Sequence, residues 1–195
     1  VYLDGIPLVE AASRDELDQS PGKPFWFAEV KDGVTTLWGR FQEVDPNEQT
    51  VEINVRQSIF YPSRELVHYV TVRGFEMSQA ATNWAALTAE QIGLIGRHWS
   101  KGWVIENNTI SHSRCVGITL GKYGDQYDNT YQQNSQAYTS CIDRALKYGW
   151  NKQSIGHHRV CDNEVFECGQ AGIVGVMGAV FSTIDGKSIH DIDIN

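Results

Sequence analysis

The sequence is poor in basic residues and has no long apolar run, and each absence excludes a class of protein. It holds 16 Lys and Arg against 24 Asp and Glu, a net charge of −8. Nucleic-acid binding needs clustered Lys and Arg, so we expect no nucleic-acid partner. No apolar stretch is as long as a membrane span, so we expect no membrane partner. At 195 residues the chain can form one large domain or two small ones, each with a core.

Cysteine is scarce, and its spacing matches no known site. The four cysteines contain no C-x-x-C pair and no spacing typical of a metal centre; they are Cys115, Cys141, Cys161 and Cys168. We interpret them as small apolar residues of the core, neither disulfide-bonded nor bound to zinc. Reduced cysteines are typical of a cytoplasmic protein, so we predict that location. We expect no metal and no cofactor.

A short pattern recurs in the second half of the chain. Residues 103–118 and 159–173 superpose when Ile110 is set on Val165. The matched pairs are then Ile105 with Val160, Asn108 with Asn163, Gly117 with Gly172 and Ile118 with Ile173. A third copy spans residues 182–192, and a fainter copy spans residues 70–77. Short strands that recur with turn residues at fixed offsets bury their apolar face only by stacking.

These repeats predict the coils of a parallel β-helix. Val165 and Ile189 lie 24 residues apart, a spacing typical of one coil. Asn108 and Asn163 share a repeat position, where an inward asparagine stack satisfies the backbone of the turns. The predicted strands are 70–72, 104–106, 158–161 and 183–184, with Ile110, Val165 and Ile189 stacked inward. An antiparallel sandwich of unrelated strands is the rival interpretation.

Residues 1–68 are different in kind and predict a small antiparallel β-sandwich. Short alternating runs are separated by turn pairs such as Asp4-Gly5 and Asp32-Gly33. Residues 13–19 predict a single helical turn. The expected core of this domain is Leu3, Phe25, Phe27, Leu37, Ile53 and Val55. We place the boundary near residues 62–68, so that residues 69–195 form the partial β-helix.

A long excursion from the repeat occupies residues 122–156. Its first half is polar and rich in tyrosine, which is typical of a surface loop. Residues 137–148 predict a short helix with Ile142, Ala145 and Leu146 on one side.

Superposing the repeats also stacks polar residues into a candidate binding site. His112, Glu167 and Asp191 fall at one repeat position, and adjacent coils lie roughly 5 Å apart. Two carboxylates at that distance can hold one proton between them, which suits acid–base work or the binding of sugar hydroxyls. Gln170 stands between Gly169 and Gly172, where missing side chains would let a sugar approach. The alternative is an ordinary solvated corner without a function.

Other polar and aromatic residues carry weaker hypotheses. Tryptophan rings can stack on a sugar face, but we expect most of them to be core or loop anchors; the candidates are Trp84, Trp99, Trp103 and Trp150. Adjacent residues of a strand point to opposite faces, so His157 and His158 are not expected to share a metal.

Several blocks of the sequence resemble the family 120 glycoside hydrolases, which are bacterial β-xylosidases. The blocks cover nearly the whole chain; they are V-Y-L-D-G-I-P-L, D-P-N-E-Q-T-V-E-I-N-V-R, Y-V-T-V-R-G-F-E-M-S-Q-A-A-T-N-W-A, G-L-I-G-R-H-W-S-K-G-W-V-I-E-N-N-T-I, G-W-N-K-Q-S-I-G-H-H and E-C-G-Q-A-G-I-V-G. The resemblance implies an all-β fold, a right-handed parallel β-helix with an inserted β-sandwich. It also implies retaining hydrolysis of xylo-oligosaccharides by two carboxylates.

The family's two catalytic carboxylates are expected on coils that would follow Asn195, so no catalytic residue is assigned here. We expect the chain to be a piece of a longer protein, with the rest of that polypeptide as its partner. The sequence leaves the oligomeric state open. A non-catalytic carbohydrate-binding or structural β-helix is the alternative. A polysaccharide lyase would need an aspartate cluster for Ca²⁺, and Asp125 and Asp128 are too few.

Overall fold

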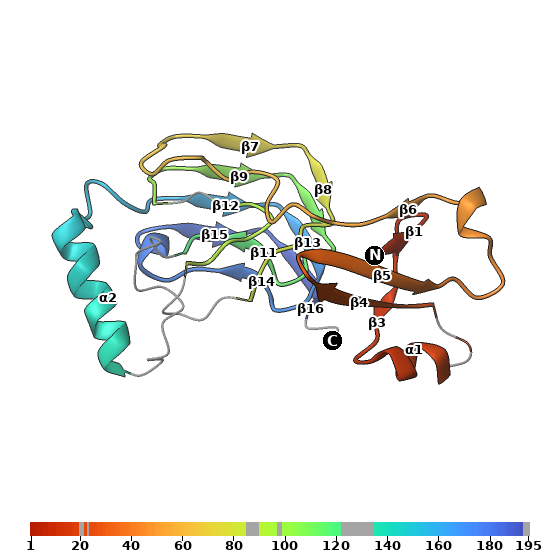
Figure 1. Cartoon of the computed structure of the whole chain (residues 1–195). Coiled ribbons are helices and arrows are strands. Elements are labelled where there is room, and N and C mark those ends of the chain that lie inside the picture. The colour runs from red at the N-terminus through yellow and green to blue at the C-terminus, as the bar shows by residue number, and fades with distance from the viewer. Residues whose placement is uncertain (20–21, 23, 85–89, 97–98, 122–134, 193–195) are drawn as a thin grey trace. The chain divides into compact units, whose positions relative to one another are not determined.

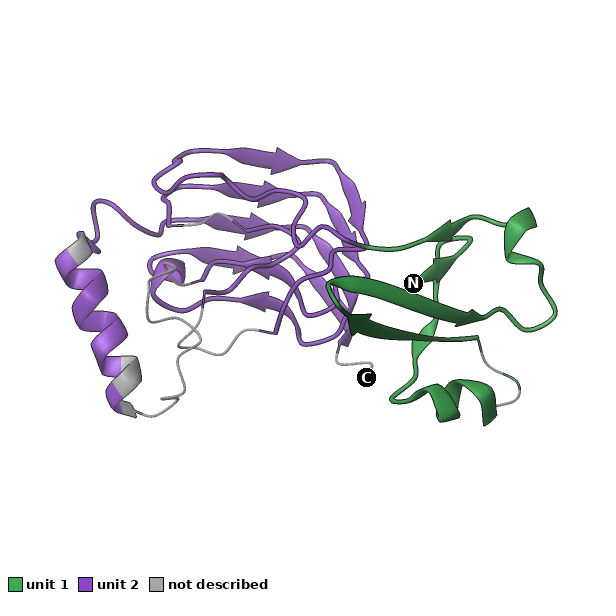
Figure 2. Cartoon of the chain, viewed as in Figure 1, with its two compact units in different colours: residues 1–54 green, residues 55–195 purple. Residues whose placement is uncertain are grey.

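The structure is a computed structural model that describes residues 1–19, 22, 24–84, 90–96, 99–121 and 135–192. The chain divides into two compact units, Val1–Asn54 (unit 1) and Val55–Asn195 (unit 2), coloured separately in Figure 2. Strands dominate both units, so the fold is all-β, as predicted. No helix among the described residues is long and apolar enough to span a membrane.

Unit 1 contains two three-stranded sheets and one short helix. Strands β1 (Tyr2–Leu3), β2 (Ile6–Pro7) and β6 (Val51–Glu52) form an antiparallel sheet. Strands β3 (Val9–Glu10), β4 (Phe25–Lys31) and β5 (Val34–Arg40) form the other sheet, in which β3 and β4 are parallel. Helix α1 (Arg14–Gln19) and the 3₁₀ turn η1 (Pro46–Glu48) complete the unit.

The turns of unit 1 are those that the sequence predicts. Asp4 and Gly5 have φ angles of 51° and 80°, and Asp32 and Gly33 have angles of 52° and 77°. Two consecutive positive φ angles are typical of the tight turn that matches the twist of a hairpin. Both turns therefore fix the register of the hairpins that they close.

The core of unit 1 differs from the prediction. Its cluster joins α1 to the β4–β5 sheet, and it consists of Ala11, Leu17 and Phe25, with Phe27 and Trp38 packed against it. The prediction was wrong for Ile53 and Val55, since Ile53 is half exposed and Val55 is 78% exposed. The strand predicted over residues 51–55 is only the two residues of β6. The apolar side chains that follow Glu52 therefore do not pack against a second sheet.

Unit 2 is a stack of parallel strands in three sheets (Figure 1). The first sheet holds β7 (Thr71–Arg73), β9 (Val104–Glu106), β12 (Arg159–Cys161) and β15 (Thr183–Asp185). The second holds β8 (Glu76–Ser78), β10 (Thr109–Ser111), β13 (Glu164–Cys168) and β16 (Ser188–Ile192). The third holds β11 (Val116–Thr119) and β14 (Ala171–Val174). We call one traverse of the sheets a pass.

The predicted register is confirmed, although Ile189, which was expected to stack inward, is 41% exposed because no described strand covers β16 on its far side. Ile105 pairs with Val72 and Val160, and Val165 pairs with Ile110 and Ile189, all in parallel. Alternation then sends one apolar column from each sheet inward. The buried cluster of unit 2 is built on these columns; among its members are Val72, Met77, Ile105, Ile110, Val160 and Val165.

Segment 55–68 belongs to the compact unit of the parallel stack, whereas the sequence analysis grouped it with residues 1–54. The backbone N–H groups of Ile59 and Phe60 both donate to the carbonyl of Leu94, and Phe60 forms a parallel bridge with Ile95. The segment is thereby hydrogen-bonded to the first pass, although it contains no regular strand.

The inward asparagine stack is confirmed. Asn108 Nδ2 donates to Asn163 Oδ1 at 2.9 Å, and Asn163 Nδ2 donates to the carbonyl oxygens of Ile105 and Cys161 at 2.8 and 3.0 Å. Both side chains are buried. Because these amides replace water at the inner side of the turn, they satisfy backbone groups that burial would otherwise leave unpaired.

The predicted helix is α2 (Ser135–Tyr148), and residues 122–134 of the predicted loop, with Asp125 and Asp128, lie outside the described residues. Cys141 and Ala145 pack with Trp99, Ile155 and Met177 in a second apolar cluster. Ile142 is half-buried at its edge, as expected, but the prediction was wrong for Leu146, which is 53% exposed.

All four cysteines are free and buried, which confirms their interpretation as small apolar residues. Burial raises the pKa of the Cys168 thiol to about 11, so this thiol stays protonated and unreactive at neutral pH.

Candidate functional site

The candidate site lies at the C-terminal ends of the second-sheet strands, where the chain leaves this sheet. One residue per pass adopts a positive φ at this corner: Gln79 (65°), His112 (52°), Glu167 (50°) and Asp191 (49°). We call these four residues the corner column. Left-handed backbone costs a non-glycine residue roughly 1–2 kcal/mol. Because all four passes have a positive φ at this corner, the geometry of the turn requires it. The conformation is therefore no sign of strain at an active site.

The structure brings His112 and Glu167 into direct contact, as their shared repeat position predicts. His112 Nε2 lies 2.7 Å from Glu167 Oε2, with the His112 side chain 19% exposed and the Glu167 side chain 37% exposed. His112 Nδ1 lies 2.9 Å from Ser111 Oγ. The imidazole therefore bridges a buried hydroxyl and a half-exposed carboxylate. This bridge orients Glu167 through Oε2, while Oε1 is a second acceptor on the same carboxylate.

The order Ser111–His112–Glu167 matches the residue types of a hydrolytic triad, but the geometry argues against that role. A nucleophilic serine must reach substrate and must lie beside donors that stabilise an oxyanion. Ser111 is only 6% exposed. Ser111 contacts Nδ1 of the imidazole and Glu167 contacts Nε2, so the ring lies between the hydroxyl and the carboxylate. We interpret the three residues as a positioning network for the Glu167 carboxylate.

Asp191 is at the next corner but has a different partner. Its Oδ2 lies 2.8 Å from His190 Nδ1, and His190 Nε2 lies 3.6 Å from Glu164 Oε1. The hydrogen bond to Asp191, and after it the nearby carboxylate of Glu164, raises the pKa of His190 above its ordinary value. The structure thus pairs Glu167 with His112 and Asp191 with His190, so each carboxylate of the corner column has its own imidazole.

An aromatic surface, which the sequence analysis did not identify, lies beside the corner column. The rings of Phe166 and His190 stack with centroids 5.1 Å apart and an interplanar angle of 2°, while His112 meets Phe166 edge-on at 6.2 Å. Phe166 occupies an outward position of β13, paired with Ser111 and His190. Aligning the repeats would have revealed an outward phenylalanine between polar neighbours. Aromatic rings beside carboxylates form a surface of the kind that binds sugars.

Gln170 lies in the turn between β13 and β14, where its backbone N–H donates to Cys115 O at 2.8 Å. The proposed role of Gly172 as a thin wall for a ligand was wrong. A Cβ at Gly172 would lie 2.7 Å from Ile189 Cγ2, so the core of the next pass fills that space. Gly172 therefore permits close packing of the passes rather than access for a sugar.

The tryptophans divide as expected between core and surface. Trp99 and Trp103 are fully buried, Trp150 donates from its indole to Met177 O, and Trp84 is exposed. His157 stacks on Phe181, whereas His158 is buried and accepts a hydrogen bond from Trp103 N–H at Nδ1. Within the described part of the chain, no cluster of three His, Cys, Asp or Glu side chains could hold a metal ion.

The chain resembles one solved structure closely, a protein described as XylC in complex with xylose. The TM-score is 0.90 at 38% sequence identity, over 98% of this chain and 34% of the XylC chain. The chain therefore spans about a third of the length of that protein and shares its fold over this third. No family model and no curated protein matches the sequence.

Proposed function

We propose that this chain is part of a retaining glycoside hydrolase of family 120, a β-xylosidase that acts on xylo-oligosaccharides. The observation that carries the proposal is the similarity of almost the whole chain to a protein solved with bound xylose. The sequence blocks that resemble the family 120 enzymes support it independently. In this proposal unit 2 is a run of coils of a right-handed parallel β-helix, and unit 1 is the inserted β-sandwich. A cytoplasmic location stays a prediction.

The role of this chain in the reaction is to bind and orient the sugar. The bridge from Ser111 through His112 holds the Glu167 carboxylate, which can accept hydrogen bonds from sugar hydroxyls. The ring of Phe166, stacked on His190, offers an aromatic surface to the C–H groups of a pyranose. In retaining hydrolysis one carboxylate attacks the anomeric carbon and a second protonates the leaving oxygen. We expect both of these carboxylates outside this chain.

The test is hydrolysis of an aryl β-xyloside, which releases a single xylose, by a full-length protein that contains this chain, followed by proton NMR of the first-formed xylose. We expect xylose to appear first as the β-anomer, because double displacement retains the configuration. Initial release of the α-anomer would refute a retaining mechanism. Binding of xylobiose without any cleavage would refute the enzyme and favour a non-catalytic carbohydrate-binding β-helix.

A further inference from the structure

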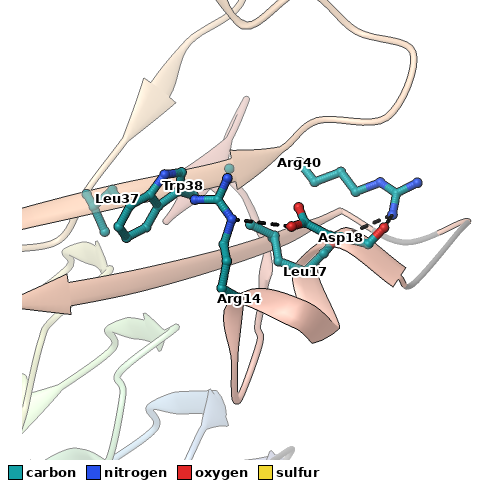
Figure 3. A pocket seen from close by; sticks show the side chains of 7 residues that line it. Arg14, Leu17, Asp18, Leu37, Trp38 and Arg40 are labelled. Carbon is teal, nitrogen blue, oxygen red and sulfur yellow. Dashed lines mark hydrogen bonds and ion pairs between the residues drawn. The ribbon is translucent and has the colours of Figure 1, made fainter.

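A pocket in unit 1 lies between helix α1 and strand β5 (Figure 3). Its volume is about 470 Å³, within the range of roughly 300–1,000 Å³ that is typical of small-molecule sites. The residues that line it are Arg14, Leu17, Asp18, Leu37, Trp38, Gly39 and Arg40. The sugar-binding role proposed above uses residues of unit 2 alone, so this pocket has no part in it.

The pocket carries an excess of positive charge in an acidic protein. Two guanidinium groups, of Arg14 and Arg40, line it together with a single carboxylate, of Asp18. The chain as a whole has a net charge of −8. Arg14 Nε lies 3.6 Å from Asp18 Oδ2, and both side chains are exposed, so this ion pair is weak. The pair engages Nε, and the two terminal NH₂ groups of Arg14 are the donors that a ligand would meet.

Arg14 lies over the aromatic ring of Trp38. Its Cζ lies 4.6 Å from the ring centre of Trp38, and Trp38 in turn stacks on Phe27 at 5.8 Å. Figure 3 shows the Arg14 guanidinium between Trp38 and Asp18. A guanidinium fixed on an aromatic face presents its planar N–H donors in one orientation, which reduces the entropy lost on binding.

Arg40 supplies the second positive charge from the opposite wall. Its Nη1 lies 3.4 Å from the carbonyl oxygens of Leu17 and Asp18, near the C-terminal end of α1. These long hydrogen bonds tie the helix to β5. Leu17 and Leu37 add apolar surface to the lining of the pocket.

We propose that this pocket binds a carboxylate-bearing sugar, a hexuronic acid. A carboxylate is planar and accepts two parallel N–H bonds from a guanidinium, while the sugar ring packs on the apolar floor. The two arginines are the reason for inferring a ligand with a carboxylate. The choice of a sugar rests on the proposed function, because glucuronic acid is a side group of xylan. The pocket would then bind acidic substituents of the xylan chain.

The experiment is isothermal titration of the protein with glucuronate and, as matched ligands, with glucose, acetate and phosphate. We expect glucuronate to bind at least tenfold more tightly than any of the three. Arg14→Gln should weaken glucuronate binding at least tenfold, whereas the control Arg64→Gln, at an exposed position outside the pocket, should leave it unchanged. Asp18→Asn should strengthen binding several-fold, because it removes the negative charge beside the Arg14 guanidinium, which repels a carboxylate ligand.

Equal binding of glucose, acetate or phosphate would overturn the proposal, as would an Arg14→Gln variant that binds glucuronate normally. If Arg14→Gln does not fold, the Asp18→Asn variant decides, since unchanged or weaker binding contradicts the proposal. Xylobiose hydrolysis is measured separately. Hydrolysis without glucuronate binding refutes only the pocket, and glucuronate binding without hydrolysis refutes only the proposed enzyme.

Discussion

At the scale of single residues, Glu167 is the side chain on which the sugar-binding role depends most. It is half exposed, and a histidine that is itself held by a buried serine fixes one of its oxygens. Such an arrangement orients a carboxylate for a ligand, whereas a carboxylate that serves only the turn would be bound to backbone groups. The contacts of Glu167 are with a side chain, which favours the binding role.

The Glu167→Gln substitution separates the two roles. A hydrogen bond to a charged group contributes roughly 1.5–3 kcal/mol, so we expect a loss of tenfold or more in kcat/KM of the full-length protein. The melting temperature should stay nearly unchanged. Glu76→Gln is the matched control, because Glu76 is an exposed carboxylate on β8, a strand of the same sheet. A lower melting temperature with intact kinetics would assign Glu167 to the turn instead.

Two histidines predict opposite effects of pH on stability. His68 Nδ1 accepts the Lys101 N–H at 3.0 Å; burial, and then the charge of Lys101, lower the pKa of His68. Its contribution to stability is therefore complete above the unfolded pKa of about 6.5 and is lost as pH falls through the folded pKa. Asp191 raises the pKa of His190, so the contribution of His190 is complete below about 6.5 and is lost as pH rises through the folded pKa.

Melting temperatures between pH 5 and pH 8 test these signs. His68→Gln should reduce the loss of stability on the acidic side, and His190→Gln should reduce the loss on the alkaline side. Profiles identical to that of the unmodified protein would show that neither histidine is linked to folding.

At the scale of elements, the asparagine stack joins consecutive passes. Asn163 donates to two backbone carbonyls and accepts from the backbone and side chain of Asn108. Asn163→Ala leaves several buried polar groups unpaired, at a cost of roughly 1–3 kcal/mol for each one that water cannot reach. We therefore expect a loss of at least about 2 kcal/mol in the free energy of unfolding, measured by urea denaturation.

The residue before Asn108, the other asparagine of the stack, provides the control for this prediction. Asn107 is exposed and has a φ of 53°, a conformation that glycine adopts without penalty. Asn107→Gly should therefore change stability by less than about 1 kcal/mol. Equal losses in Asn163→Ala and Asn107→Gly would mean that the stack contributes nothing beyond the turn.

The sequence predicted those elements whose pattern is read locally or repeats. Turn pairs such as Asp4-Gly5 specify a backbone conformation by themselves. An apolar residue at the same repeat position in two copies, Ile105 and Val160, specifies a parallel register. Packing between segments without a repeat was not predictable in this way. Alternation at Val55 indicated a strand but not whether anything covers it, and the composition of α2 did not show that Cys141 rather than Leu146 faces the core.

For the candidate site, the shared repeat position placed His112 beside Glu167 correctly. It did not predict that Asp191 would pair with its own neighbour His190, because side-chain rotamers and not the register decide that contact. The aromatic stack of Phe166 and His190 and the pocket around Arg14 depend on packing that no motif in the sequence marks.

At the scale of the whole molecule, the chain matches about a third of XylC. The sugar-binding residues proposed here lie in this third, whereas the catalytic carboxylates are expected elsewhere. We therefore predict that the 195-residue chain alone releases no p-nitrophenol from an aryl β-xyloside. Turnover by this chain would contradict the assignment and would point to Glu167 and Asp191 as the catalytic pair.

The structure of a full-length protein with bound xylose tests the central claim most directly. The account predicts a xylose hydroxyl within about 3.2 Å of the Glu167 carboxylate and the sugar ring close to His112 or Phe166. A xylose that contacts no residue of the corner column, with Glu167 still bound to His112 alone, would contradict it.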